Sequence, residues 1–248
     1  MTKKFILGAV AALVLGPAAV SAADLPVKAP PPIPIYDWTG FYIGAAGGGS
    51  LGTSDQLDPT TGQSFTSGYN IKGGLFGGTL GYNWQVSSFV VGFEGDVSWV
   101  HEYGFNLDVG PASTFITQGL SSAAFASSTT ETWMATARGR FGYAVNNLLF
   151  YATGGYAAAG AEASVRDNTT NALLASATST RSGWTAGGGL EWGFAPNWSA
   201  KFEMLYMKFN SVTFNTVQAE GPRTVPLDDT IARADINYRF GGPVVARY

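Results

Sequence analysis

The sequence predicts an all-β fold, an eight-stranded antiparallel up-and-down β-barrel that crosses a membrane with its strands. Three observations predict it: apolar and polar side chains alternate along many segments, charged residues are scarce, and long and short connections take turns along the chain. Successive side chains of a strand point to opposite faces of a sheet. A closed sheet with this alternation can turn one face to lipid and keep polar groups on the other.

The scarcity of charge argues against an ordinary soluble enzyme. Charged residues make up 12% of the 248 residues, whereas a typical soluble domain carries about 25%. The aromatic content of 14% and the net charge of −3 exclude the composition of a disordered chain. No basic excess indicates nucleic-acid binding. The absence of Cys excludes disulfides, thiolate metal sites and a Cys nucleophile.

The N-terminus has the pattern of an exported protein. Lys3 and Lys4 precede an apolar run that ends in small residues, so residues 1–22 are predicted to be a secretory signal peptide. That run is shorter than the roughly 20 residues of a spanning helix. Residues 23–37 contain five prolines and predict an extended periplasmic linker. The outer-membrane barrel domain is then expected at residues 38–248.

Alternation is clearest in residues 132–145. The even-numbered positions include Arg138 and Arg140, whereas the odd-numbered positions are aromatic or small and apolar. Eight segments show comparable alternation, and each reaches the ~9–11 residues that a tilted membrane strand needs. These segments cover residues 38–50, 73–84, 89–100, 132–145, 148–165, 182–194, 198–209 and 230–240.

The connections between these segments predict the direction of the barrel. Residues 85–88, 146–147 and 195–197 are short, whereas four connections are long and polar: 51–72, 101–131, 166–181 and 210–229. Outer-membrane barrels have short periplasmic turns and long external loops. We therefore expect four long external loops and both termini on the periplasmic side.

Aromatic residues gather near the ends of the predicted strands. Tyr and Trp rings suit the boundary between hydrocarbon and headgroups, so these residues predict two aromatic girdles. The predicted interface aromatics are Trp38, Phe41, Tyr42, Tyr82, Trp84, Trp99, Phe141, Tyr143, Trp192, Trp198, Tyr238 and Phe240.

Charged residues on the opposite face are expected to fill the barrel, because an eight-stranded barrel is just wide enough for side chains to occupy its interior. Five acids and five bases share this parity, and buried charges must be paired, so a salt-bridge network is predicted. A narrow conducting path and a catalytic cluster remain alternatives for these residues. They are Glu94, Asp96, Arg138, Arg140, Glu191, Lys201, Glu203, Arg233, Asp235 and Arg239.

The sequence offers little for catalysis. His101 is the single histidine, so the usual histidine and cysteine metal clusters cannot form. A catalytic arrangement of His101 with Asp96 or Asp108 has no supporting spacing. The glycines of residues 73–81 lie in a strand pattern without a following helix, which disfavours a nucleotide site. We expect no enzymatic activity, no cofactor and no metal.

Three segments carry a resemblance to a known family. Residues 38–44, residues 237–248 and the start of the predicted mature chain at residues 23–26 resemble the small outer-membrane β-barrel proteins of alphaproteobacteria. These proteins are often labelled porin family, and they are related to the OmpA-like transmembrane barrel and to opacity-type surface proteins. The resemblance implies an abundant envelope protein that stabilises the outer membrane and presents loops outside, and it supplies no catalytic residues.

The expected function is that of a structural surface protein of a Gram-negative outer membrane with a lumen filled by charges. The alternative is a narrow porin for passive diffusion of small hydrophilic solutes. A soluble lipocalin-type barrel and an enzyme at the outer rim are further alternatives. Expected partners are outer-membrane lipid, lipopolysaccharide and the assembly machinery. Peptidoglycan and a host surface stay open, and no nucleic acid is expected.

Overall fold

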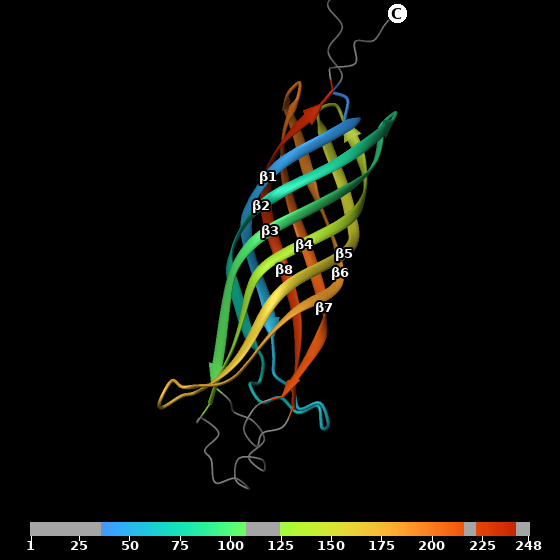
Figure 1. The fold of residues 1–248 in the computed structure, drawn as a ribbon. Coiled ribbons are helices and arrows are strands. Elements are labelled where there is room, and N and C mark those ends of the chain that lie inside the picture. Colours follow the sequence, from blue (N-terminus) through green and yellow to red (C-terminus); the bar gives the residue numbers. More distant parts are fainter. Residues whose placement is uncertain (1–35, 108–124, 216–221, 242–248) are drawn as a thin grey trace, which may run out of the picture. The chain divides into compact units, whose positions relative to one another are not determined.

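The computed structural model describes residues 36–107, 125–215 and 222–241. In these ranges eight strands pair in chain order, each antiparallel to the next, and the first also pairs with the last (Figure 1). The prediction of an all-β, eight-stranded antiparallel barrel is therefore confirmed. None of the described residues belongs to a helix that could cross a membrane. The predicted signal peptide, and the predicted linker up to residue 35, lie outside the described residues.

The strands are longer than the predicted segments and contain 15 to 23 residues each. They are β1 (Gly40–Ser54), β2 (Tyr69–Val86), β3 (Phe89–Leu107), β4 (Phe125–Val145), β5 (Leu148–Asp167), β6 (Leu173–Ala195), β7 (Trp198–Asn215) and β8 (Pro222–Phe240).

The three short connections lie together at one end of the barrel, here called the turn end. Two residues separate β2 from β3, β4 from β5 and β6 from β7. Ser87 and Asn146 have φ angles of 57° and 56°. Two-residue hairpin turns require this left-handed backbone, because it matches the twist of the strands that they join.

At the opposite end, here called the loop end, the strands continue into segments that were predicted as loops. The prediction of a loop at residues 166–181 is wrong over most of its length, because β5 continues to Asp167 and β6 begins at Leu173. From Ala175 to Thr180, every residue of β6 is Ala, Ser or Thr. A pattern without large apolar residues does not resemble a lipid-facing strand, but it suits a strand that stands in water.

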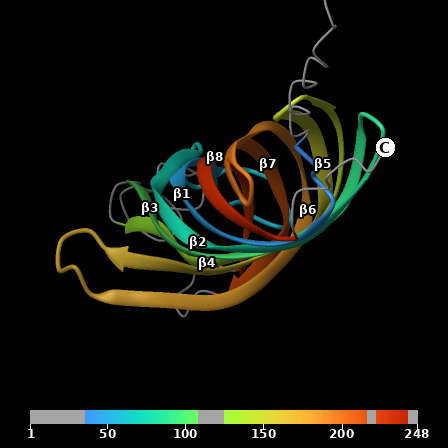
Figure 2. The ribbon, with the colours of Figure 1, turned by 90° about the horizontal axis from the view of Figure 1, so that it is seen from above.

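The barrel is not closed along its whole length. β6 pairs with β7 only from Gly183, opposite Phe209, whereas β6 and β5 pair up to Leu173. The hairpin of β5 and β6, yellow to orange in Figure 2, extends away from the ring of strands. Ser176, Thr178 and Thr180 on its outer surface are exposed. This part of the barrel carries the surface of a water-soluble protein.

Nearer the turn end, the outer surface is apolar. Aromatic side chains form one girdle at the turn end and a second girdle at mid-length, and no charged side chain of the described residues points outward between them. On β6 the two girdles are marked by Trp192 and Trp184, eight positions apart, or roughly 26 Å along a strand. The second girdle consists of Phe76, Trp99, Trp133, Tyr156, Trp184 and Tyr206.

Most of the predicted interface aromatics lie on this outer surface. Of the predicted aromatics that face outward, Trp99 belongs to the second girdle and the remaining ones belong to the girdle at the turn end. The outward-facing residues are Phe41, Tyr82, Trp84, Trp99, Phe141, Tyr143, Trp192, Trp198, Tyr238 and Phe240. The assignment is wrong for Trp38 and Tyr42, whose side chains are 1% and 2% exposed inside the barrel.

The belt between the girdles allows a direct test. Phe202 lies on β7 midway between Trp198 and Tyr206, and it faces outward. Replacing it with Arg should lower the free energy of unfolding from the bilayer by about 2–4 kcal/mol, because the charge lies near the bilayer midplane. The measurement is reversible unfolding from lipid vesicles. Thr178→Arg on β6, also outward but beyond the girdle, is the control, and an equal loss in both variants would contradict the belt.

Candidate functional site

The interior of the barrel is the candidate site, because the charged residues of the chain converge there. All ten charged residues predicted to face inward are buried, although nine of the ten meet in one network and Arg239 does not. Period-two parity explains their burial. Each sits on the face of its strand opposite to the apolar belt.

Two arginines form the centre of the network. Arg138 on β4 binds Glu203 with Nη1 to Oε2 at 2.9 Å and Asp96 with Nη2 to Oδ2 at 3.0 Å, and it also contacts Glu94. Arg233 on β8 binds the same two acids, with Nη1 to Asp96 Oδ1 at 2.9 Å and Nη2 to Glu203 Oε1 at 2.8 Å. The two forks thus share carboxylates from β3 and β7, and they connect opposite walls of the barrel.

Lys201 extends the network on β7. Its Nζ lies 2.8 Å from Glu94 Oε2 and 3.5 Å from Asp235 Oδ1. Glu94 therefore accepts from a lysine and an arginine, and Tyr42 Oη donates to its Oε2 at 2.7 Å. This tyrosine was predicted at the membrane interface, but β1 turns its side chain inward because the neighbouring Phe41 faces out.

The end of the network nearest the turns is built on Arg140 and Glu191. The Arg140 Nη2 atom lies 2.8 Å from Glu191 Oε2, and its guanidinium carbon lies 4.1 Å from the centre of the Tyr151 ring. Ser199 Oγ and Asn237 Nδ2 donate to the other oxygen of Glu191, at 2.5 and 2.9 Å. Both oxygens of the Glu191 carboxylate are thus bonded, as a buried carboxylate requires.

Arg239 does not join the network, so its predicted role there is wrong. Its guanidinium donates to the carbonyl oxygens of Thr39 at 3.2 Å and Pro196 at 2.8 Å, and it lies 4.9 Å from the centre of the Tyr36 ring. The residue stands one position before the end of β8, where free turn carbonyls are within reach. Arg239 therefore closes the mouth of the barrel at the turn end.

Trp38 closes the same mouth from the N-terminal side. It precedes β1, and its ring packs against Val90, Leu149 and Tyr151 inside the barrel. Its backbone N–H donates to Gln85 Oε1 at 2.8 Å. A residue outside the strand is not bound by strand parity, so its predicted place at the membrane interface is wrong.

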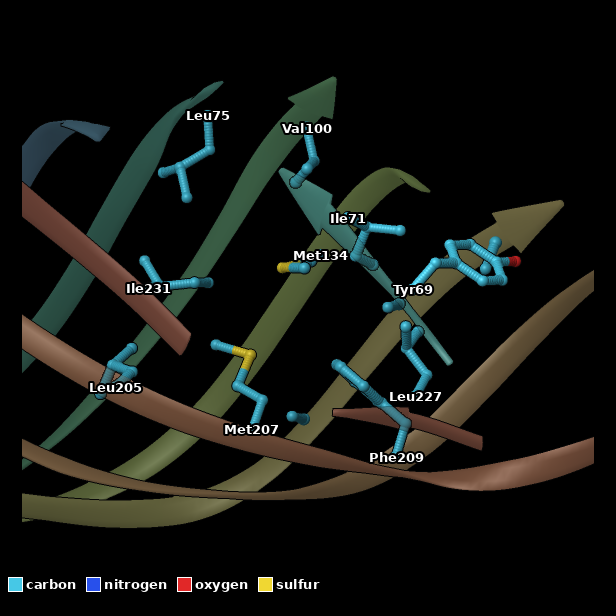
Figure 3. Close-up of a cluster of buried hydrophobic side chains, with 13 residues drawn as sticks. Tyr69, Ile71, Leu75, Val100, Met134, Leu205, Met207, Phe209, Leu227 and Ile231 are labelled. Carbon is cyan, nitrogen blue, oxygen red and sulfur yellow. The ribbon is translucent and has the colours of Figure 1, made fainter. Parts of the chain in front are cut away.

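Beyond the network, the filling of the lumen changes character. In the half nearer the loop end, apolar side chains from six strands point toward one another (Figure 3). The charged residues Glu131, Arg181, Arg223 and Asp229 are also buried in this half, so the predicted filling by charges is incomplete there. On β7 the inward residues pass from Lys201 and Glu203 to Leu205, Met207 and Phe209. The labelled members of the cluster are Tyr69, Ile71, Leu75, Val100, Met134, Leu205, Met207, Phe209, Leu227 and Ile231.

A folded loop covers this apolar core at the loop end. Phe65 and Gln56, from the connection between β1 and β2, are buried. Arg223 of β8 donates to Gln56 Oε1 at 2.8 Å, and its guanidinium carbon lies 4.5 Å from the centre of the Phe65 ring. In the same loop, the backbone N–H groups of Thr60 and Thr61 donate to Asp58 and hold the pKa of that carboxyl below its usual value.

Neither the charge network nor His101 has the arrangement of a catalytic centre. The carboxylates are held by cations and hydroxyls, as where Tyr151 Oη donates to Glu203 Oε2 at 2.9 Å. His101 faces outward on β3, whereas Asp96 faces inward, so these two cannot act together. Asp108 lies outside the described residues. The described residues include no group of three or more ligands that could hold a metal ion.

Sequence reasoning missed the uncharged members of the network. Tyr42, Tyr151, Thr136, Ser199 and Asn237 each bond to one of its charges. Strand parity alone could have found them, because each alternates with a residue of the apolar belt. The search for charges passed over these hydroxyl and amide groups.

The network predicts a large loss of stability when one partner is removed. Arg138→Met removes one of the two arginines that bind Asp96 and Glu203 together, and we expect the free energy of unfolding to fall by about 3–5 kcal/mol. Urea unfolding of the refolded protein measures it. The matched control is Lys208→Met, which breaks an exposed 3.7 Å pair with Asp228 and should cost less than about 1 kcal/mol. Similar losses in both variants would refute a buried network.

Among solved structures, the chain is similar to the outer membrane protein OprG of Pseudomonas aeruginosa, with 13% identity and a TM-score of 0.48 over 84% of this chain and 100% of that chain. It is also similar to Neisserial surface protein A, with 12% identity and a TM-score of 0.40 over 82% of this chain and 98% of that chain.

Protein relatives are more similar in sequence. A 31 kDa outer-membrane immunogenic protein of Brucella melitensis is 32% identical over 96% of this chain and its own full length. A 22 kDa outer membrane protein of Rhizobium leguminosarum is 29% identical over 78% of this chain and 72% of its own length. The family model described as outer membrane protein beta-barrel domain matches residues 9–240. The chain therefore belongs to this family, and it is a β-barrel protein of the bacterial outer membrane.

Proposed function

We propose that the protein is a sealed structural barrel, which anchors a hydrophilic surface to the outer membrane and conducts no solutes. The observation that carries this proposal is the continuous filling of the lumen. Trp38 and Arg239 close the turn end, the ion network and the apolar core fill the middle, and Phe65 with Arg223 covers the loop end. A solute would have to displace four successive layers of packed side chains.

The outer surface supports the surface role. With short turns in the periplasm, the loop end faces the outside, as in other outer-membrane barrels. The strands beyond the second girdle then hold a rigid, hydroxyl-rich and weakly charged surface away from the lipid, exemplified by Ser176, Thr178 and Thr180. This surface has the composition for contact with water and external partners.

A specific observation favours the porin alternative. Asn83 Oδ1, Ser98 Oγ and Thr185 Oγ1 are buried inward atoms without a hydrogen-bond partner among the described residues. Polar atoms of this kind in protein interiors are usually met by internal water. Water beside the ion network could form a narrow path if the apolar core opened.

Conductance separates the two functions. Single channels of the refolded protein in planar bilayers should show no steady conductance, because Leu205, Met207, Ile231 and their neighbours fill the lumen beyond the ion network. A general diffusion porin reconstituted in the same bilayers is the positive control, and liposome swelling with small sugars is the second measurement. Long-lived channel openings, together with liposome swelling at a rate that depends on the size of the sugar, would reject the sealed barrel and establish the porin.

A further inference from the structure

The outer face of β2 and β3 carries two basic side chains just beyond the second girdle. His101 follows Trp99 by two positions on β3, so both point outward. On β2, Lys72 precedes Phe76 by four positions, so it lies nearer the loop end and also points outward. The register places Gly74 opposite His101 and Phe76 opposite Trp99. Two cationic or polar groups thus stand on the loop-end side of one aromatic pair.

The aromatic pair gives this site an apolar floor. The rings of Phe76 and Trp99 are stacked, with their centres 5.5 Å apart, and both side chains are exposed on the outer face of the barrel. Trp at this level lies at the boundary between hydrocarbon and headgroups. A lipid beside these rings would therefore place its first acyl carbons on them and its headgroup at the height of His101 and Lys72.

Gly74 leaves a recess between the two basic groups. A Cβ atom at Gly74 would have its nearest neighbour, the Gly48 carbonyl oxygen, at 3.9 Å, so the glycine is not required by crowding. The outward positions Gly47 and Gly49 on β1 are similarly open, with nearest neighbours at 4.0 and 3.5 Å. The recess is bordered by Phe76 toward the turn end, His101 across the ladder and Lys72 toward the loop end.

The pairing of β3 with β4 changes beside His101, while the alternation of β3 and its register with β2 continue unbroken. Between the pairs Trp99–Trp133 and Glu102–Glu131, β3 has two residues where β4 has one, which is the pattern of a β-bulge. Bulges bend a strand and redirect its side chains, and they are common beside functional sites. The bulge lies beside the recess.

The side chain of Lys72 is exposed on the outer face of β2. No ion pair of Lys72 occurs within the described residues, whereas Lys208, at the same girdle on β7, pairs with Asp228 at 3.7 Å. An ammonium offers three donors and an imidazole at least one, and a phosphate oxygen accepts such bonds strongly. The shared chemistry is that of an anionic, phosphate-bearing group held at the membrane boundary.

We propose that Lys72, His101 and the Gly74 recess form a binding site for the headgroup phosphate of an anionic lipid in the leaflet at the loop end. The aromatic pair holds the upper acyl chain, the recess admits the phosphate, and the two basic groups bond to its oxygens. In the proposed orientation this lipid belongs to the outer leaflet. The site does not depend on whether the lumen conducts.

Native mass spectrometry of the refolded protein in detergent tests the proposal, with diphosphorylated lipid A as the probe. Dephosphorylated lipid A and phosphatidylglycerol are the comparison lipids. The wild type should bind the phosphorylated form more tightly than the dephosphorylated form. Lys72→Gln should weaken this binding about fivefold, the effect of one basic residue near an anionic lipid.

Two further variants separate the site from general surface charge. Gly74→Leu keeps both basic groups but fills the recess, and it should weaken binding at least as much as Lys72→Gln. Lys208→Gln removes a charge that is already paired, and it should leave lipid binding unchanged. Heat-dependent gel mobility confirms that each variant is folded.

Three results would overturn the proposal. Equal binding of the phosphorylated and dephosphorylated lipids would show that no phosphate is recognised. Equal losses of lipid binding in Lys72→Gln and Lys208→Gln would show that the lipid is attracted by surface charge in general and not by this site. Displacement of the lipid by inorganic phosphate at millimolar concentration would assign the site to free phosphate instead of a lipid.

Discussion

The closed hydrogen-bonded ladder is the constraint on which the rest of the structure depends. Between the girdles the outer surface of the barrel meets hydrocarbon, where an unpaired backbone N–H or C=O has no water to bind. The pairing of β1 with β8, from Phe41 opposite Phe240 to Ser54 opposite Leu227, removes the two edges that an open sheet would leave. Only beyond the second girdle do β6 and β7 separate, and there water can satisfy their free edges.

Once the backbone is paired, the medium outside the barrel determines which side chains of each strand face outward and which face the lumen. β7 shows both regimes: Phe202 and Met204 face lipid while Lys201 and Glu203 face the lumen, and further along Lys208 faces outward while Met207 faces inward. Where the outside is hydrocarbon, polar side chains can find hydrogen-bond partners only in the lumen. Where the outside is water, apolar side chains gain by filling the lumen, as in a soluble barrel. The barrel is thus a membrane protein at one end and resembles a soluble protein at the other.

The ion network contributes more to the choice of register than to net stability. Burying paired charges offers little gain over an apolar core, because desolvation offsets the attraction between the charges. A slip of one residue between β3 and β4, however, would turn Glu94 or Arg138 toward the lipid. The cost of an unpaired charge in hydrocarbon makes every such slip unfavourable. Hydroxyl and amide groups such as Ser199 and Asn237 accompany the charges, since both donate to the Glu191 oxygen that Arg140 leaves open.

The sequence by itself determined the number of strands, their antiparallel order and the face on which each charge lies, because period-two alternation is a local property of the chain. It did not determine which inward residues meet, since Lys201 and Glu94 are 107 positions apart and are joined only by the barrel's closure and register. Trp38 and Arg239 were misplaced for the same reason: each lies at a strand end, where turn carbonyls and a mouth built from several strands decide the contact. Alternation states which way a side chain points, whereas its partners depend on strands that come together only in the closed sheet.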